Sequence, residues 1–410
     1  RLPARRLILT DFMSATTGSL TSKLDHRSWL AWLARDGERD LARNLVLLSV
    51  FLLVSIGTVM VFSAAAFHWA IRDDTFYFLR KQLAWVAIAG LGGLFFYQID
   101  YRLLRRCYWQ LLVLSTILLF AVLIPQLGTD VNQARRWIRL GGGLQFQPSE
   151  LAKLSVIVFV AAFLANDPER RRRFLGGFLV VCFAISPLVL LILFEPDLGT
   201  SLFVLGIAVM LLIVGGMRLS YMLVVGVVFA PIVGYAAHLR WDEIRDRVMG
   251  FLDPESVYQV KHSLTALGAG GWSGKGLGAG GQKLGFLPEA HTDFILAIVG
   301  EELGYLGTIA VIALFILLVW GGIGILWRAR DLFGFLLGAG IVLSLASQAL
   351  LNVAVVTASA PTKGIALPFV TFGGSGLFMA LCQIGVLLSI DRVWREDPQV
   401  AELNRKEQTA

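Results

Sequence analysis

The sequence predicts an all-α integral membrane protein with about ten transmembrane helices. Of its 410 residues, 56% are apolar and only 16% are charged, and the mean hydropathy is +0.71. In a set of soluble domains, roughly a quarter of the residues would be charged. The apolar residues are also gathered in runs of about 20, the length of helix that crosses a bilayer. Soluble domains and a disordered chain are therefore both excluded.

The predicted spans are nearly charge-free stretches separated by polar or glycine-rich segments. In chain order they cover residues 44–71, 82–99, 107–129, 149–166, 174–194, 198–217, 219–239, 303–327, 332–362 and the part of 364–390 after Gly374. Only the stretch 149–166 has an acidic and a basic residue, Glu150 and Lys153, near its start. An even number of spans places both chain ends on one side of the membrane.

The charge distribution predicts which side that is. Most of the 36 Lys and Arg residues lie in segments on the side of the termini, most visibly at Arg170–Arg173. Under the positive-inside rule this side is cytoplasmic, which accounts for the net charge of +7 without a nucleic acid. We therefore expect a cytoplasmic segment 1–43, a membrane domain 44–390 and a cytoplasmic tail 391–410, all in a cytoplasmic (inner) membrane. The first span is too long for a cleavable signal and is expected to be an anchor.

Two of the predicted outward segments are long. The first, 126–148, is expected to be a loop, and the second, 240–292, joins spans seven and eight. Apolar residues at helical spacing predict two short amphipathic helices in the second, within 241–251 and 257–267. The glycine-rich stretch Gly268–Gly285 follows, and it lacks the frame of a nucleotide-binding motif. We expect a flexible loop whose backbone N–H groups can approach a diphosphate.

Ionisable residues in or beside the spans are the first candidates for a functional site, because they are costly in a membrane. Glu150 and Lys153 are three residues apart on one helical face and can pair. The pair can be structural, or it can belong to a site that Arg136 and its basic neighbours would extend. Such a cationic rim suits a sugar diphosphate.

Asp293 stands where a polar string gives way to an apolar one. It can cap the following helix, or it can be a carboxylate with a raised pKa that acts as a general base. Glu301 and Glu302 follow inside an apolar stretch and need a polar cavity or a partner. Lys363 is the only charge in the last outward loop, where it can anchor the chain at the interface or approach a diphosphate.

No group of His and Cys has zinc-binding spacing, and the three cysteines lie in or beside apolar runs. The residue types present support acid–base and electrostatic catalysis.

Several strings of the sequence together resemble the SEDS family of membrane proteins, in order and over almost all predicted spans. They are Ala134–Ile138 (ARRWI), Gln147–Lys153 (QPSELAK), Glu195–Thr200 (EPDLGT), Gly271–Gly278, Leu287–Phe294 (LPEAHTDF), Pro361–Gly364 (PTKG) and Gly373–Ser375 (GGS). The details resemble the branch of the family that acts in cell division more than its elongation relative.

The resemblance implies the SEDS fold and a peptidoglycan glycosyltransferase that polymerises lipid II at the outer face of the membrane. It implies that Asp293 is the essential carboxylate. The substrate-binding residues that it implies are Arg136, Glu150, Lys153, His291, Thr292, Lys363 and Ser375. Expected partners are undecaprenyl-diphosphate-linked glycan, a class B penicillin-binding protein, and the divisome proteins FtsQ, FtsL, FtsB and FtsN at the division septum.

Our hypothesis is that Asp293 removes the proton of the attacking 4-hydroxyl and that the anomeric carbon inverts. The departing diphosphate would be stabilised by Arg136, Lys153, Lys363 or a divalent cation such as Mg²⁺ or Mn²⁺, whose presence and identity the sequence leaves open. The alternatives are an elongation polymerase, a lipid II flippase that uses the same charges to carry a headgroup across, and a scaffold without catalysis.

Overall fold

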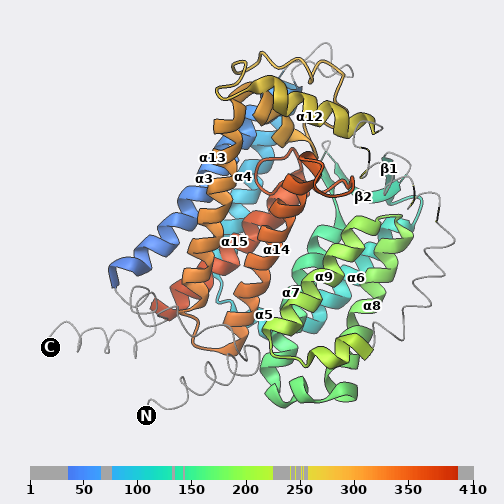
Figure 1. The fold of residues 1–410 in the computed structure, drawn as a ribbon. Helices are drawn as coiled ribbons and strands as arrows, with labels where there is room; N and C mark the ends of the chain where they lie inside the picture. Colours follow the sequence, from blue (N-terminus) through green and yellow to red (C-terminus); the bar gives the residue numbers. More distant parts are fainter. Residues whose placement is uncertain are drawn as a thin grey trace.

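A computed structural model describes residues 36–65, 76–131, 134–141, 144–224 and 257–395, with isolated positions at 241, 245, 251 and 253. The protein is an elongated bundle of membrane-length helices. One end carries α12 and the glycine-rich loop, and the other carries α5 (Figure 1). We call them the α12 end and the α5 end. Each predicted span except the seventh corresponds to a helix; the seventh and the first predicted amphipathic helix lie largely outside the described residues.

The helices follow the predicted spans, with differences at their ends. They are α3 (Asp36–Ala65), α4 (Tyr77–Gln98), α5 (Arg102–Arg106), α6 (Tyr108–Leu123), α7 (Pro148–Asn166), α8 (Val180–Phe194), α9 (Leu198–Val214), α12 (Tyr258–Gly270), α13 (Ile295–Leu326), α14 (Leu332–Val356) and α15 (Gly374–Arg395). In the described part, six helices are long and apolar enough to cross a membrane, and α6 and α9 are shorter apolar helices. The chain is therefore a multi-pass membrane protein.

Several boundaries differ from the prediction, and three of them concern the segments around the site. The ninth span was predicted to reach residue 362, but α14 ends at Val356 and the following residues form an irregular segment. The third was predicted to reach residue 129, but α6 ends at Leu123. The helix of the eighth span begins earlier, at Ile295, and is interrupted at Gly304, whose φ of 70° and ψ of −169° are not helical. Apolar composition fixed the membrane-crossing parts, but it does not mark where a helix gives way to buried irregular chain.

The segment between α6 and α7 contains a small sheet, where the sequence predicted a loop. Its strands are β1 (Gly128–Val131), β2 (Ala134–Gly141) and β3 (Leu144–Phe146). They form an antiparallel sheet in the order β1-β2-β3, and Ile138 pairs with Gly128 on one side and Phe146 on the other. The sheet lies beside the start of α7 at the α12 side of the bundle (Figure 1). It thereby holds Arg136, a residue of β2, near the ends of α8 and α9.

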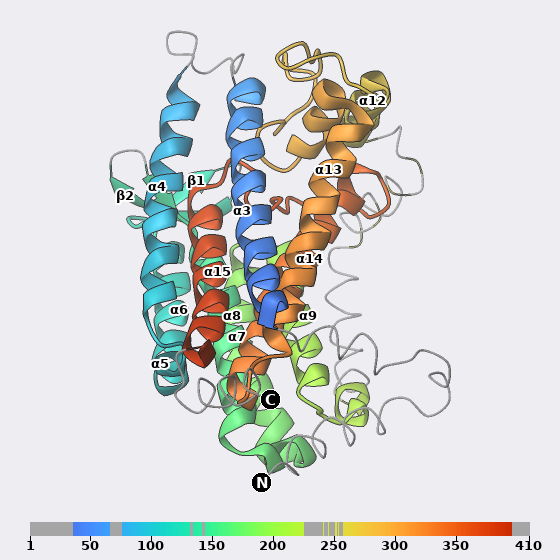
Figure 2. The same cartoon turned by 90° about the vertical axis from the view of Figure 1, so that its left-hand side faces the viewer.

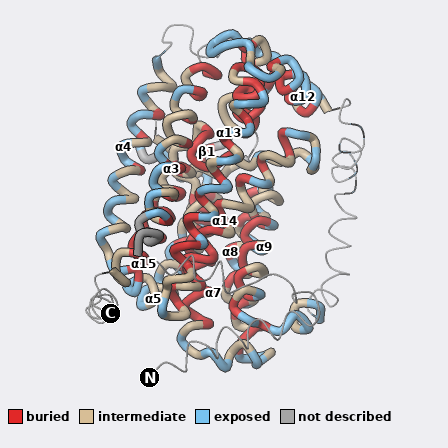
Figure 3. Tube along the Cα trace, turned by 60° about the vertical axis from the view of Figure 1, so that its left-hand side comes forward, coloured by how far each residue is buried: buried red, intermediate tan, exposed pale blue. Residues whose placement is uncertain are grey.

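Helix α7 runs through the centre of the molecule. In its apolar window 83% of the residues are buried, compared with 33% in the window of residues 174–194, which belongs on the lipid-facing side. The buried positions concentrate along α7 and α14 (Figure 3). Around this centre α15 packs along α4 and α13 packs along α3 (Figure 2). Glycines permit the closest approach, since a Cβ on Gly385 would lie 2.2 Å from the carbonyl oxygen of Gly93.

Candidate active site

A cavity of about 180 Å³ lies between α12, the start of α13 and the irregular segment after α14. It is lined by Gln259, Glu289, Asp293, Phe294, Thr362, Lys363 and Gly364. Two predicted site residues, Asp293 and Lys363, therefore meet in one cavity, although they come from segments on either side of two long helices. The cavity is at the α12 end of the bundle, since Gln259 of α12 lines it.

Asp293 does not cap the helix that follows it. The N-cap of α13 is Phe294, and that position makes no side-chain capping hydrogen bond. Instead the backbone of Asp293 is fixed, because the amide of Asn352 donates to its carbonyl oxygen at 2.8 Å. Its carboxylate lies against Gly364, where an added Cβ would be only 2.7 Å from Oδ2. Fixing the backbone aims the carboxylate at the cavity.

The surroundings of Asp293 favour the protonated carboxyl group. Its pKa is raised to about 7, mainly by burial and also by the neighbouring carboxylates of Glu289 and Asp197, while the guanidinium of Arg136 opposes the increase. No described residue donates a hydrogen bond to the Asp293 carboxylate. A carboxyl group with a pKa near neutrality is poised to take up and release a proton at physiological pH. This arrangement agrees with the acid–base alternative for Asp293.

Glu289 is held in an unusual conformation on the wall of the cavity. Its φ of 54° places it in the left-handed region, which a residue with a side chain rarely adopts. The hydroxyl of Thr292 donates to its Oε2 at 2.6 Å. Thr292 therefore acts through Glu289. The side chain of its neighbour His291 is not part of the cavity lining, and its ring packs against those of Phe78 and Phe372 at centroid distances of 5.1 and 6.0 Å. Strain of this kind is common at functional sites.

Arg136 lies beside the cavity, bound to the turn between α8 and α9. Its Nε and Nη2 donate to the carbonyl oxygens of Glu195 and Pro196 at 3.2 and 2.8 Å. Its Nη1 is 3.5 Å from Oδ2 of Asp197, a residue that also caps α9 by accepting from the backbone N–H of Thr200. Arg136 thus acts on Asp293 through its charge, while its donors hold this turn.

Glu195 in the same turn was not predicted as a separate site residue. It is only 1% exposed, and neither of its carboxylate oxygens has a hydrogen-bond partner among the described residues. Its pKa is raised to about 8, mainly by burial and also by the carboxylate of Asp197, while Arg136 opposes the increase. Glu195 is therefore mostly protonated at neutral pH.

Glu150 and Lys153 form the predicted pair at the start of α7. Lys153 Nζ is 2.7 Å from Oε1 of Glu150 and donates to Oε1 of Gln348 at 3.2 Å. At the nearby start of α15, the hydroxyl of Ser375 accepts a hydrogen bond from the backbone N–H of Gln147. Lys153 is buried, so its charge depends on Glu150 for compensation. These residues form a second polar group, separate from the lining of the cavity.

Helix α14 connects the two polar groups. Gln348 and Asn352 lie one helical turn apart on the same face. Gln348 contacts Lys153 and donates to the carbonyl oxygen of Ala366, while Asn352 donates to those of Asp293 and Ile365. The two amides therefore fix the irregular segment that carries Lys363 relative to both carboxylates. Their role was missed because an amide in an apolar run carries no motif.

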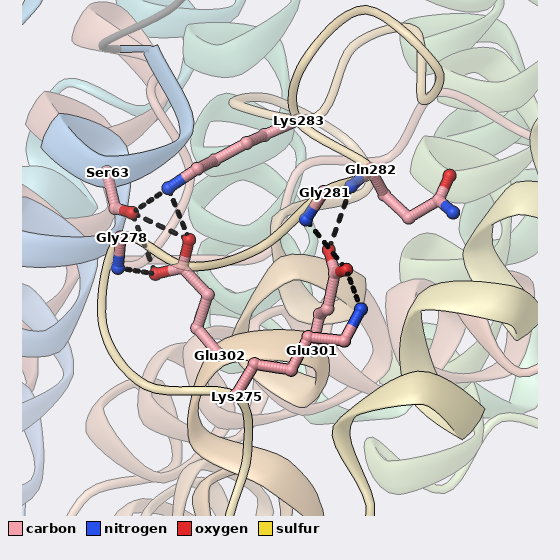
Figure 4. A network of polar contacts seen from close by, with 8 residues as sticks. All are labelled: Ser63, Lys275, Gly278, Gly281, Gln282, Lys283, Glu301 and Glu302. Atoms are coloured by element: carbon pink, nitrogen blue, oxygen red, sulfur yellow. Dashed lines mark hydrogen bonds and ion pairs between the residues drawn. The ribbon is translucent and has the colours of Figure 1, made fainter.

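The backbone N–H groups of the glycine-rich loop were expected to approach a diphosphate. In the structure three of them instead donate to carboxylates of the protein itself. The backbone N–H of Gly278 donates to Oε2 of Glu302, and those of Gly281 and Gln282 donate to Glu301 (Figure 4). The expectation was therefore wrong for these groups. It failed because Glu301 and Glu302, which the sequence showed to need partners, accept hydrogen bonds from the loop.

The fold and the site define a multi-pass membrane protein with an acid–base cavity at one end of its helix bundle. Residues 43–396 match the family model FtsW/RodA/SpoVE, which is described as a cell cycle protein family. The chain belongs to this family, and the resemblance to SEDS proteins is confirmed.

Relatives and solved structures agree with this assignment. The probable peptidoglycan glycosyltransferase FtsW of Trichlorobacter lovleyi is 42% identical over 351 residues, covering 84% of this chain and 92% of that protein. Stage V sporulation protein E of Bacillus subtilis is 38% identical over 357 residues, covering 86% and 97%.

Among solved structures, a chain of a peptidoglycan synthase complex, studied for the coordination of polymerization and crosslinking, superposes with a TM-score of 0.71. It is 27% identical, and the match covers 86% of this chain and 98% of that one. The rod shape determining protein RodA of Thermus thermophilus gives a TM-score of 0.64 at 26% identity, covering 90% and 100%.

Proposed function

We propose that this chain polymerises lipid II into glycan strands during septal wall synthesis, with Asp293 as the general base. It is a peptidoglycan glycosyltransferase of the FtsW/RodA/SpoVE family, as its FtsW relatives are named. The observation that carries the role of Asp293 is its place in the cavity. It is a carboxylate with a pKa of about 7 that no described residue pairs, and it lines the same cavity as Lys363.

In the proposed step Asp293 accepts the proton of the 4-hydroxyl of the incoming lipid II N-acetylglucosamine. The hydroxyl oxygen attacks the anomeric carbon of the terminal N-acetylmuramic acid of the growing chain. The new C–O bond forms as the bond to the diphosphate oxygen breaks, and the configuration inverts. The electron pair leaves with undecaprenyl diphosphate, and Asp293 then releases its proton to solvent. A base with a pKa near the working pH suits this exchange.

The leaving diphosphate needs positive charge, and Lys363 is the cation that lines the cavity. The charge of Arg136 acts at the rim, and Lys153 remains a proposed contributor from the start of α7. Electrostatic stabilisation of developing charge in a site shielded from water is often the largest contribution to catalysis.

A divalent cation also remains a proposal. Among the described residues there is no group of three or more His, Cys, Asp or Glu side chains that could hold a metal ion. The donors of the described residues alone therefore do not form a site, and a Mg²⁺ ion held there would need diphosphate oxygens among its ligands, as is common for Mg²⁺. We derive no step through a metal, and the dependence of polymerisation on added Mg²⁺ or Mn²⁺ tests this point.

The proposed orientation places the α12 end outside the cell and the α5 end, with both termini, in the cytoplasm. The α5 end carries Arg105, Arg106 and the basic segment Pro168–Arg172, which supports the positive-inside assignment. We also propose a class B penicillin-binding protein as partner, because a similar chain lies in a peptidoglycan synthase complex. The division proteins FtsQ, FtsL, FtsB and FtsN are proposed partners on the basis of family resemblance.

The direct test is a gel-resolved polymerisation assay with purified protein and lipid II, with and without the penicillin-binding partner. The change Asp293→Asn should lower the rate by about 10²–10⁴-fold, since the general base is lost. Glu169→Gln is the matched control, because it removes an exposed carboxylate at the α5 end. Polymer formed by Asp293→Asn at near the wild-type rate would rule out the base, and headgroup transfer in vesicles without polymer would favour a flippase.

A further inference from the structure

The residue that α12 contributes to the cavity differs in kind from its ionisable neighbours. Glu289, Asp293 and Lys363 are ionisable, whereas Gln259 of α12 is neutral. Gln259 is half-buried, and no described residue hydrogen-bonds its side-chain amide. An amide that lines a cavity and is not used by the protein can both donate to and accept from a ligand.

The position of Gln259 depends on how the first turns of α12 are held. His262 lies three residues further on the same face, and its Nδ1 is 2.8 Å from Oε1 of Gln282 in the glycine-rich loop. The His262 ring also packs at a tilt against the ring of Tyr258, with the centroids 4.3 Å apart. Further along the helix, the hydroxyl of Ser263 donates to the carbonyl oxygen of Val356 at the end of α14. These contacts fix the helix both above the cavity and against the bundle.

Gln282 is in turn fixed by the start of α13. Its backbone N–H donates to Oε2 of Glu301 at 3.1 Å, and the neighbouring N–H of Gly281 donates to Oε1 at 2.8 Å. Lys275 neutralises the same carboxylate at 2.7 Å. Figure 4 shows the Gln282 side chain extending away from Glu301, so its backbone and its amide serve two different partners. Hydrogen bonds thus run without a gap from Glu301 through Gln282 to His262.

We propose that Gln259 binds the sugar of the lipid-linked substrate, and that Glu301, Gln282 and His262 are positioning residues which hold it there. N-acetylhexosamines present hydroxyl and acetamido groups, which a neutral amide can hydrogen-bond in both directions. The diphosphate belongs with the ammonium group of Lys363, which lines the same cavity. The assignment deepens the proposed function and rests on it, because it presumes that lipid II occupies this cavity.

A steady-state assay of lipid II polymerisation tests the sugar contact. The change Gln259→Leu should raise KM for lipid II about threefold to tenfold, as expected for one lost hydrogen bond. It should leave kcat within about twofold, because a contact made equally in the ground state and transition state affects only KM. Partial misfolding would instead lower apparent kcat at constant KM. The matched control is Thr265→Val, which removes an exposed hydrogen bond on the same helix.

The positioning residues have a separate test. The change Gln282→Met keeps the size of the side chain and removes the contact to His262, so it should raise KM about twofold to threefold. The double variant Gln259→Leu, Gln282→Met should have the KM of Gln259→Leu alone, because residue 282 acts only through residue 259. Hydrogen exchange of the amides in Tyr258–His262 should be faster in Gln282→Met than in the wild type.

The outcomes separate the two levels of the proposal. Polymerisation by the wild type with an unchanged KM in Gln259→Leu overturns the sugar contact and leaves the proposed function standing. Additive effects in the double variant, or unchanged hydrogen exchange in Gln282→Met, overturn the positioning residues. Absence of polymerisation by the wild type, with and without the penicillin-binding partner, overturns the proposed function and the sugar contact with it.

Discussion

Two carboxylate environments at the beginning of α13 differ in how fully they are paired. Glu302 accepts from Ser63 at 2.7 and 2.8 Å, from Lys283 at 2.6 Å and from the backbone N–H of Gly278 at 3.0 Å. The carboxylate of Asp293 accepts from no described residue, and the pKa of its carboxyl group is raised towards neutrality by burial and by Glu289 and Asp197. Burial is common to both, so the supply of partners decides which carboxylate is structural and which is available for proton transfer.

The largest expected contrast is in stability. Glu302→Gln leaves the buried ammonium of Lys283 without its counter-charge and should lower the free energy of unfolding by about 3–5 kcal/mol. Asp293→Asn removes a charge that lacks hydrogen bonds and should keep or raise stability. Thermal unfolding of both purified variants in detergent measures the difference.

A double variant sharpens this contrast. Glu302→Gln combined with Lys283→Met removes both charges and should be more stable than Glu302→Gln alone. Equal melting temperatures of Glu302→Gln and the wild type would contradict a structural role for the pair.

The next effect concerns the space around the unpaired carboxylate. A Cβ added by Gly364→Ala would lie 2.7 Å from Oδ2 of Asp293, so the carboxylate must move. We expect kcat/KM for polymerisation to fall by about tenfold to a hundredfold, because small displacements of catalytic groups are costly. Gly206→Ala is the matched control, since its added Cβ meets nothing within 4 Å. Full activity of Gly364→Ala would show that this position of Asp293 is not required.

The pH profile should report the neighbours of Asp293. The base must be ionised, so kcat/KM should rise with pH and level off above about 7. Arg136→Gln removes a charge that lowers the pKa of Asp293, and the rising part of the profile should move to higher pH. Glu289→Gln removes a charge that raises this pKa, and the profile should move to lower pH. Shifts in the same direction in both variants would contradict the assignment.

The smallest effect is expected at Glu195, whose pKa of about 8 lies above the usual value for glutamate. A carboxyl group with a raised pKa in the folded state loses stability as pH rises from about 4.5 to 8. Glu195→Gln is neutral throughout, so it should match the wild type at about pH 4.5 and exceed it at pH 9. Melting temperatures at the two pH values check this. A variant that is no more stable than the wild type at pH 9 would contradict the raised pKa.

The sequence predicted the membrane-crossing helices because apolar length alone defines them, and it predicted Asp293 and Lys363 because their motifs are specific. It also showed that Glu301 and Glu302 need partners. It could not identify those partners, since Lys275 and Lys283 lie in a glycine-rich loop whose path depends on tertiary packing. The same limit explains why the N–H groups of this loop were predicted to approach a diphosphate. The sequence did not show that carboxylates of the chain itself lie close enough to accept from them.

Other parts of the site carry no signal that a single sequence reveals. Gln348 and Asn352 look like isolated polar residues in an apolar helix, and their role depends on the irregular segment packed against them. The three-stranded sheet was missed because its short strands lie between membrane spans, where the hydropathy pattern is dominated by the helices. Arg136 was identified by its motif. Its hydrogen bonds to the turn before α9 depend on its place in that sheet, which the motif does not reveal.

The interruption at Gly304 separates the first turns of α13 from the rest of the helix. A Cβ there would lie 2.4 Å from the backbone nitrogen of Gly274 and 2.5 Å from the carbonyl oxygen of Trp272, so no larger residue fits. Just beyond it, the backbone N–H groups of Tyr305 and Leu306 donate to the carbonyl oxygens of Gly271 and Trp272. A single residue without a side chain therefore lets the glycine-rich loop be threaded against α13 through main-chain contacts.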